Sequence, residues 1–160
     1  MEFRQRLRLT GGNTSICATR ASNSCRFSTG LADTNTTLWG GFVAAVAGDK
    51  FFFAGDTGYS AQHFVEIGAR HSRIDLALLP IGAYEPRWFM RPQHVNPAEA
   101  VQIHRDVRAR RSLGIHWGTF QLTDEPLDQA VTDLDIARRA CGVDAADFFV
   151  LRHGATYVLA

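Results

Sequence analysis

The chain has few cysteines, no long apolar run and almost no net charge. Its three cysteines, Cys17, Cys25 and Cys141, are scattered and form no CxxC pair, which indicates a reducing compartment rather than a disulfide framework. No apolar run approaches the roughly 20 residues that a membrane-spanning helix needs. Residues 1–25 lack the apolar stretch of a secretion signal. We therefore expect a cytoplasmic protein.

The charge balance excludes a further class of function. The formal net charge is +1 at pH 7, whereas a dedicated nucleic-acid surface is usually strongly basic, so we expect no nucleic-acid partner. Residues 1–28 nevertheless hold five arginines and a single acid. Such an arm could bind phosphate or anionic lipid, but a poorly ordered terminus is the simpler interpretation. We expect a poorly defined basic segment over residues 1–28 and one domain over residues 29–160.

Motifs of the common catalytic sites are also missing. The chain has no HxH, HxxxH or HExxH pair, no Cys/His cluster, no GxSxG, no GxxxxGK[ST] and no GxGxxG. A catalytic zinc site needs about three protein ligands, and a two-metal site needs more. No local pattern in the sequence supplies them.

What is present indicates an α/β domain, for which 160 residues provide enough chain to bury a core. Two β-rich runs, 37–47 and 50–54, flank a Gly-Asp turn and predict a hairpin, after at most a short strand over 3–9. The expected elements that follow are a helix over 60–70, a strand over 75–80, a helix from 96 to about 111, a strand over 112–116, a helix over 127–140 and strands over 147–151 and 155–159. This alternation predicts a layered fold, and the hairpin makes the sheet mixed.

Two polar residues end predicted strands. Asp56 follows the aromatic run FFFAG, and His116 follows SLGI. The carboxyl ends of strands are where α/β proteins bind ligands, so both side chains are candidate metal ligands, and Asp56 could also serve as a general base. The alternatives are that Asp56 caps the following helix and that His116 is a hydrogen-bonded core histidine.

Residues 81–96 form a long predicted loop rich in aromatics, arginine and proline, and such loops are usually functional. His94 could polarise a substrate or protonate a leaving group, although a plain surface histidine fits equally well. Tyr84, Arg87 and Trp88 could form a substrate-binding wall in which Arg87 suits a phosphate. The alternative is that the aromatic side chains hold the loop on the core.

Six segments, taken in order, resemble the carboxyl-terminal half of one family: TLWGGF, FFFAGDTGY, DLALLPIGAYEPRWFM, QHVNPAEAV, IHWGTF and DFFVLRHG. It is the N-acyl-phosphatidylethanolamine-hydrolysing phospholipase D family, within the metallo-β-lactamase-fold hydrolases. The resemblance covers about residues 29–154. It implies the second half of an αβ/βα sandwich, with a mixed sheet and helices on one face.

The resemblance also implies a site and a reaction. Asp56 matches the aspartate that bridges two zinc ions, His116 matches a late histidine ligand, and His94 matches a histidine beside the site that the family needs for activity. The implied reaction is metal-assisted hydrolysis of a phosphodiester. The implied substrate is a phospholipid of the N-acyl phosphatidylethanolamine kind, reached by contact with the membrane surface.

The chain departs from the family at three places. The HxHxDH motif, which supplies most zinc ligands, has no counterpart, and Ala155 follows DFFVLRHG where the family usually has an acid. Arg26 stands where another ligand histidine is expected, and arginine cannot bind a cation. A truncated or diverged copy would expose the apolar sheet face that its missing half should cover, and such a face usually binds a partner or a second copy.

These departures leave three hypotheses of different classes. The chain is a zinc phosphodiesterase whose ligands are completed from outside it, an inactive remnant that serves as an interaction module, or a single-metal binder. The last would use Asp56, His116 and another donor.

Overall fold

The computed structural model describes residues 15–18 and 40–159. In these residues one mixed sheet has the strand order β1-β2-β3-β4-β5-β6. The strands are β1 (Ser15–Ala18), β2 (Phe42–Val46), β3 (Asp49–Phe53), β4 (Ile74–Pro80), β5 (Ala109–Ile115) and β6 (Phe148–Phe149). The pairs from β1 to β3 are antiparallel, and those from β3 to β6 are parallel. The mixed sheet and its hairpin are as predicted.

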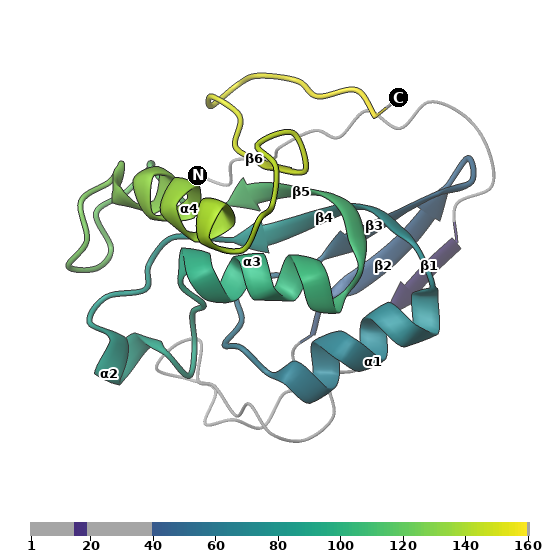
Figure 1. Ribbon diagram of the computed structural model, residues 1–160, viewed down its shortest axis with the longest axis horizontal. Helices are drawn as coiled ribbons and strands as arrows, with labels where there is room; N and C mark the ends of the chain where they lie inside the picture. The colour runs from purple at the N-terminus through teal and green to yellow at the C-terminus, as the bar shows by residue number, and fades with distance from the viewer. Residues whose placement is uncertain (1–14, 19–39, 160) are drawn as a thin grey trace.

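The main helices share one face of this sheet (Figure 1). The described helices are α1 (Ala61–His71), the short α2 (Arg87–Met90), α3 (Pro97–Asp106) and α4 (Gln129–Ala140). Helix α3 is central and contacts α1, α4, β4 and β5. Its start was readable from the sequence, because Asn96 and Glu99 form a capping box around Pro97 at the first turn.

The core lies between the helices and the sheet. Strand β4 is buried along its whole length, as a central strand flanked by two parallel neighbours should be. The alternation of side chains along each strand sends one set toward the helices. This set and its helical partners include Phe52, Ala77, Phe148, Phe64, Val101 and Leu134.

The other face of the sheet is apolar too. The strand register aligns one row across it, formed by Phe42, Phe53, Leu78, Leu113 and Phe149. Leu78 is buried, but Phe42 is 49% exposed and Phe53 43% exposed. The described residues therefore leave an aromatic patch on this face at β2 and β3.

Several boundaries differ from the sequence prediction. Residues 155–159 do not form a strand: the Tyr157 ring packs on Phe149 with centroids 4.7 Å apart, a side-chain contact without backbone pairing. Strand β5 begins at Ala109, earlier than predicted, because Arg108 adopts a φ of +55° and ends the helix. Strand β1 lies in a segment predicted as loop. The predicted strand over 3–9 lies outside the described residues, and the division at residue 28 stays a prediction.

Candidate metal centre

Three loops meet at one edge of the sheet. Strand β3 leads to Asp56, β4 leads to the loop that carries His94, and β5 ends just before His116. These strands are parallel to one another, so their carboxyl ends lie at the same edge. One potential ligand atom from each of Asp56, His94 and His116 lies within 4.8 Å of the other two. The structure thus brings together the three residues that the sequence marked for chemistry.

The cluster is partly open to solvent. Nε2 of His116 lies 3.5 Å from Oδ1 of Asp56, and the rings of His94 and His116 have centroids 5.2 Å apart. The Asp56 side chain is 51% exposed and that of His116 is 27% exposed. His116 also adopts a left-handed φ of +59°, an uncommon backbone conformation that often accompanies functional sites. An ion and a ligand could therefore reach the cluster from outside.

Two glycines let the loops approach this closely. A Cβ at Gly58 would lie 2.3 Å from the carbonyl oxygen of Pro92, and one at Gly82 would lie 2.2 Å from that of His116. Both distances are shorter than any real contact of a Cβ. Neither contact was predicted from the sequence, and the only signal for Gly82 was a glycine two residues after a buried strand.

The backbone at His94 is held by hydrogen bonds on both sides. Its N–H donates to the carbonyl oxygen of Met90 at 2.8 Å. Its carbonyl oxygen accepts from Nη1 of Arg87 at 2.8 Å, and Nη2 of Arg87 donates to Oε2 of Glu99 at 2.7 Å. Because Glu99 also completes the cap of α3 at Asn96, the cap, Arg87 and His94 form one connected unit.

The three residues predicted to contact substrate differ in burial and in their partners. Tyr84 is buried, and its hydroxyl donates to Oδ2 of Asp133 at 2.6 Å. Burial and this hydrogen bond raise the pKa of Tyr84 above its ordinary value. Arg87 is engaged by Glu99, while Trp88 is 84% exposed and available. Contact of these three residues with substrate stays a prediction.

The electrostatic setting of His94 suits a metal ligand. Burial lowers the pKa of His94, and the charge of His116 lowers it further against the opposing effect of Asp56. The neutral imidazole is the form that binds metal. Its Nδ1 is buried and has no hydrogen-bond partner among the described residues. Two imidazoles and a carboxylate are a donor set of catalytic zinc sites, so these residues fit a divalent cation.

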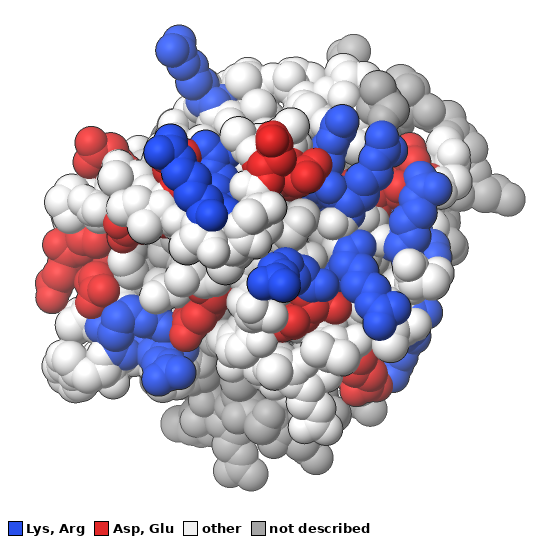
Figure 2. Space-filling model, in the orientation of Figure 1, with Lys and Arg blue, Asp and Glu red and all other residues white. Residues whose placement is uncertain are grey.

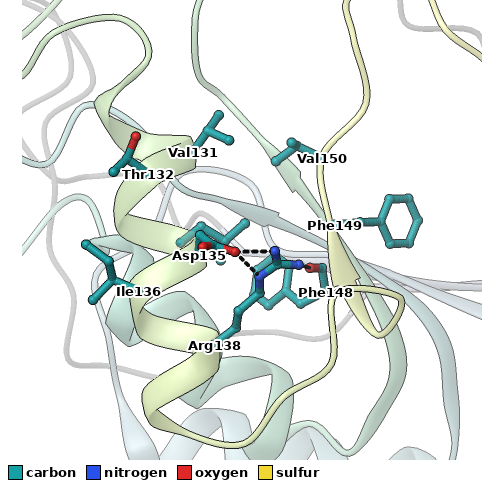
Figure 3. Close-up of a pocket in the computed structure, with 9 residues that line it drawn as sticks. Val131, Thr132, Asp135, Ile136, Arg138, Phe148, Phe149 and Val150 are labelled. Atoms are coloured by element: carbon teal, nitrogen blue, oxygen red, sulfur yellow. Dashed lines mark hydrogen bonds and ion pairs between the residues drawn. The ribbon is translucent and has the colours of Figure 1, made fainter.

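A hollow lies between α4 and β6 (Figure 3), apart from the cluster of Asp56, His94 and His116. Its volume is about 500 Å³, and its lining is mostly apolar. The charged groups in it, Asp135 and Arg138, pair with each other, and Arg138 also donates to the carbonyl oxygen of Phe148 at 3.3 Å. No residue of the metal-type cluster lines it.

The described charged side chains on the helix-bearing face are of both signs. Acidic and basic residues are interspersed over the surface drawn in Figure 2. Among the described residues, no helix has the length and apolarity to cross a membrane.

Comparison with known proteins links the chain to one superfamily. A family model described as beta-lactamase superfamily domain matches residues 1–117. The N-acyl-phosphatidylethanolamine-hydrolyzing phospholipase D 1 of Caenorhabditis elegans is 52% identical over 93 residues, which are 58% of this chain and 26% of that protein. The mitochondrial N-acyl-phosphatidylethanolamine-hydrolyzing phospholipase D of Saccharomyces cerevisiae is 47% identical over 97 residues, which are 59% of this chain and 21% of that protein. The matched region thus spans only 21% to 26% of these relatives.

Solved structures share the fold. An isothiocyanate hydrolase from Delia radicum gut bacteria superposes with a TM-score of 0.67 at 15% identity, over 91% of this chain and 54% of the other. A metallo hydrolase from the archaeon Ignicoccus hospitalis superposes with a TM-score of 0.58 at 22% identity, over 90% of this chain and 52% of the other. At these identities the likeness concerns the fold alone, and the chain spans about half of each structure.

Proposed function

This chain belongs to the family of beta-lactamase superfamily domains, and on that premise we propose that it contributes the metal centre of a metal-dependent phosphodiesterase. The observation that carries the proposal is the convergence of Asp56, His94 and His116 within 4.8 Å at one edge of the sheet. The names of the two curated relatives support a phospholipid of the N-acyl phosphatidylethanolamine kind as substrate. Zinc is the proposed metal, with two ions if the full family site is assembled.

Asp56 and His116 are the proposed ligands in this chain. A divalent ion held there would polarise a phosphoryl oxygen and lower the pKa of a bound water. Asp56 is exposed enough to face an incoming ester, while His116 is fixed by the close approach of Gly82 to its carbonyl oxygen. The family resemblance implies that His94, beside these two ligands, is needed for activity.

Metal analysis followed by turnover tests this proposal. We expect the purified chain to retain zinc at micromolar concentration and to hydrolyse bis(p-nitrophenyl) phosphate, and both properties to be lost in Asp56→Ala. Wild-type protein that binds no metal would overturn the proposal. Metal binding without turnover would show that this chain is not a phosphodiesterase by itself.

A lipid substrate requires contact with a membrane surface, and α2 offers the side chains for it. Trp88 is 84% exposed and Phe89 54% exposed, and the centroids of their rings lie 5.7 Å apart. Both residues belong to α2, which leads into the His94 loop. Tryptophan and phenylalanine favour the interface between lipid and water. We expect co-sedimentation with phosphatidylcholine vesicles to fall in the double variant Trp88→Ala, Phe89→Ala. The matched control Ile136→Ser, at a 61% exposed position on α4, should bind as the wild type does.

A second candidate function follows from the sheet face. Phe42 and Phe53 are adjacent in the hairpin and nearly half exposed, which favours an interaction module that binds a second copy or a partner chain. Light scattering of the wild type and of Phe53→Ser separates the two candidates. A dimer lost in the variant would support the module, and a wild-type monomer would exclude the homodimer.

The location is likewise a proposal. Cysteine usage supports a cytoplasmic protein, and Trp88 supports contact with the membrane surface. The yeast relative carries the word mitochondrial in its name. Fractionation of cells that express a tagged chain distinguishes these compartments.

A further inference from the structure

We infer that Asp56, His94 and His116 by themselves bind one divalent transition-metal ion, with His94 as a ligand rather than a proton donor. This inference rests on the proposed function for the presence of a metal. It goes beyond that function because it assigns the third ligand and a stoichiometry of one ion to this chain alone.

The spacing of the donor atoms is close to that of a loaded site. Ligand atoms bound to zinc at about 2.0–2.1 Å lie roughly 3 to 3.4 Å from one another. The pair formed by Nε2 of His116 and Oδ1 of Asp56 is already 3.5 Å apart, and no pair in the cluster exceeds 4.8 Å. Since the Asp56 side chain is half exposed, it can rotate toward an ion without moving the core.

His94 has a ring nitrogen that lacks a partner. Buried polar atoms in folded proteins are nearly always paired, and an exception calls for an explanation. Nδ1 of His94 is such an exception among the described residues. An ion bound by this nitrogen would supply the missing partner. Proton transfer to an exposed leaving group would leave the buried nitrogen without one.

His71 provides a comparison within the same molecule. Its Nε2 is also buried and unpaired among the described residues, but His71 belongs to no described cluster of metal-binding groups. Burial lowers the pKa of both histidines. An orphaned nitrogen alone therefore does not make a site, and of these two histidines only His94 lies in a cluster with a carboxylate and a second imidazole.

The donor set defines the ion and its ligand. Three protein ligands leave positions open for water or substrate, as in catalytic zinc sites. Imidazole nitrogens select Zn²⁺, Co²⁺ or Ni²⁺ over Mg²⁺ and Ca²⁺. One carboxylate and two neutral imidazoles around a dication leave a charge of about +1, which attracts an anionic phosphodiester.

The loop around His94 is fixed before any ion arrives. Arg87 and Met90 hold its backbone through hydrogen bonds of 2.8 Å each. The next residue, Val95, donates from its N–H to the carbonyl oxygen of Thr57 at 2.8 Å and so joins the His94 loop to the Asp56 loop. A ligand on a fixed backbone binds a metal with less ordering cost.

Titration of the metal-free full chain with Co²⁺ tests the inference, with visible absorption and calorimetry as readouts that need no catalysis. We expect one ion per chain. His94→Ala and His94→Gln should weaken the affinity by at least the roughly 10- to 100-fold that loss of an outer-shell partner costs. His71→Ala is the matched control and should keep the wild-type affinity, and thermal unfolding of each variant verifies that it is folded.

The possible failures can be told apart. If His94→Gln is folded and binds Co²⁺ as the wild type does, His94 is not a ligand, while the proposed metal centre at Asp56 and His116 survives. Two ions per chain would overturn the single-ion assignment. If the wild type binds no ion at all, this inference and the proposed function fail together.

Discussion

Two histidines near opposite ends of α3 have opposite surroundings: His104 is buried, and His94 is partly buried. His104, within α3, places Nδ1 2.8 Å from the hydroxyl oxygen of Ser112 on β5, and its ring packs on Phe148 with centroids 5.8 Å apart. His94 precedes α3, and its Nδ1 has no partner among the described residues. Burial lowers the pKa of both side chains.

The difference shows what separates a core histidine from a site histidine in this fold. Burial and a lowered pKa are common to both, so neither identifies the site. Nδ1 of His104 has an internal hydrogen-bond partner in Ser112, which adds stability. The region around His94 leaves a donor atom without a partner next to a carboxylate and a second imidazole, which is costly unless a ligand binds. Substitutions in the two regions should therefore separate stability from metal affinity.

The largest expected effect comes from Gly82→Ala, which should lower both stability and metal affinity. The new Cβ would meet the carbonyl oxygen of His116 at 2.2 Å, and backbone cannot rotate away as a side chain can. We expect a loss of about 3 kcal/mol in the free energy of unfolding and a loss of metal affinity as His116 is displaced. Urea unfolding and Co²⁺ titration measure the two effects.

Gly142→Ala is the control for this substitution. A Cβ there meets nothing within 4 Å, but the φ of +67° costs about 1 kcal/mol in a residue other than glycine. It should leave metal affinity unchanged. Wild-type affinity in Gly82→Ala would show that the contact between the two loops does not position His116.

His104→Ala should affect stability alone. It removes a buried ring and leaves the hydroxyl of Ser112 without its partner, so we expect the free energy of unfolding to fall by about 2 kcal/mol. Co²⁺ affinity should equal that of the wild type, the converse of the result expected for His94→Ala. A weakened affinity in folded His104→Ala would mean that the two ends of α3 are not independent.

Local signals in the sequence predicted much of this structure. The strand ends at Asp56 and His116 were readable because a mostly apolar run stops at a polar residue that has a glycine within two positions on either side. The start of α3 was readable because capping chemistry is confined to a few neighbouring residues. Parallel pairing then puts the strand ends at one edge, which is a consequence of the fold class.

Contacts between distant residues could not be predicted in this way. The side-chain partners of Tyr84 and Arg87 are Asp133 and Glu99, which lie 49 and 12 residues away and leave no mark in the local sequence. Contact of Tyr84 and Arg87 with substrate stays a prediction. The run at Tyr157 has the alternation of a strand, yet its ring packs on the sheet without backbone pairing. Side-chain pattern alone does not distinguish a paired strand from a segment that packs across the sheet.

Arg87→Met should lower metal affinity at His94 with little change in the free energy of unfolding. The substitution removes the donor to the carbonyl oxygen of His94 and frees Glu99, so the loop becomes less fixed. We expect Co²⁺ affinity to fall about 10-fold, the size of effect found for outer-shell partners. Arg87→Lys should restore only part of it, because an ammonium lacks the fork that holds both acceptors.

Arg91→Met is the matched control for Arg87. Arg91 also contacts Glu99, but at 3.5 Å and with a side chain that is 75% exposed, so it should contribute little. Equal losses of Co²⁺ affinity in Arg87→Met and Arg91→Met would show that the affinity depends on positive charge near Glu99. The anchoring of His94 by Arg87 would then not contribute.

The smallest expected effect is the pH dependence of stability at His104. Burial and Arg105 lower the pKa of His104 against the opposing effect of Asp147, so the folded state takes up its proton at a lower pH than the unfolded chain does. The stabilisation is therefore complete above about pH 6.5, the ordinary histidine value, and decreases as the pH falls below it, by at most about 1.4 kcal/mol per pH unit. Urea unfolding at pH 7.5 and 5.5 should show a smaller change in the free energy of unfolding in His104→Gln than in the wild type, because the glutamine side chain does not titrate. An unchanged pH effect would mean that His71 and His94, whose pKa values burial also lowers, account for the acid sensitivity, and would remove His104 from the explanation.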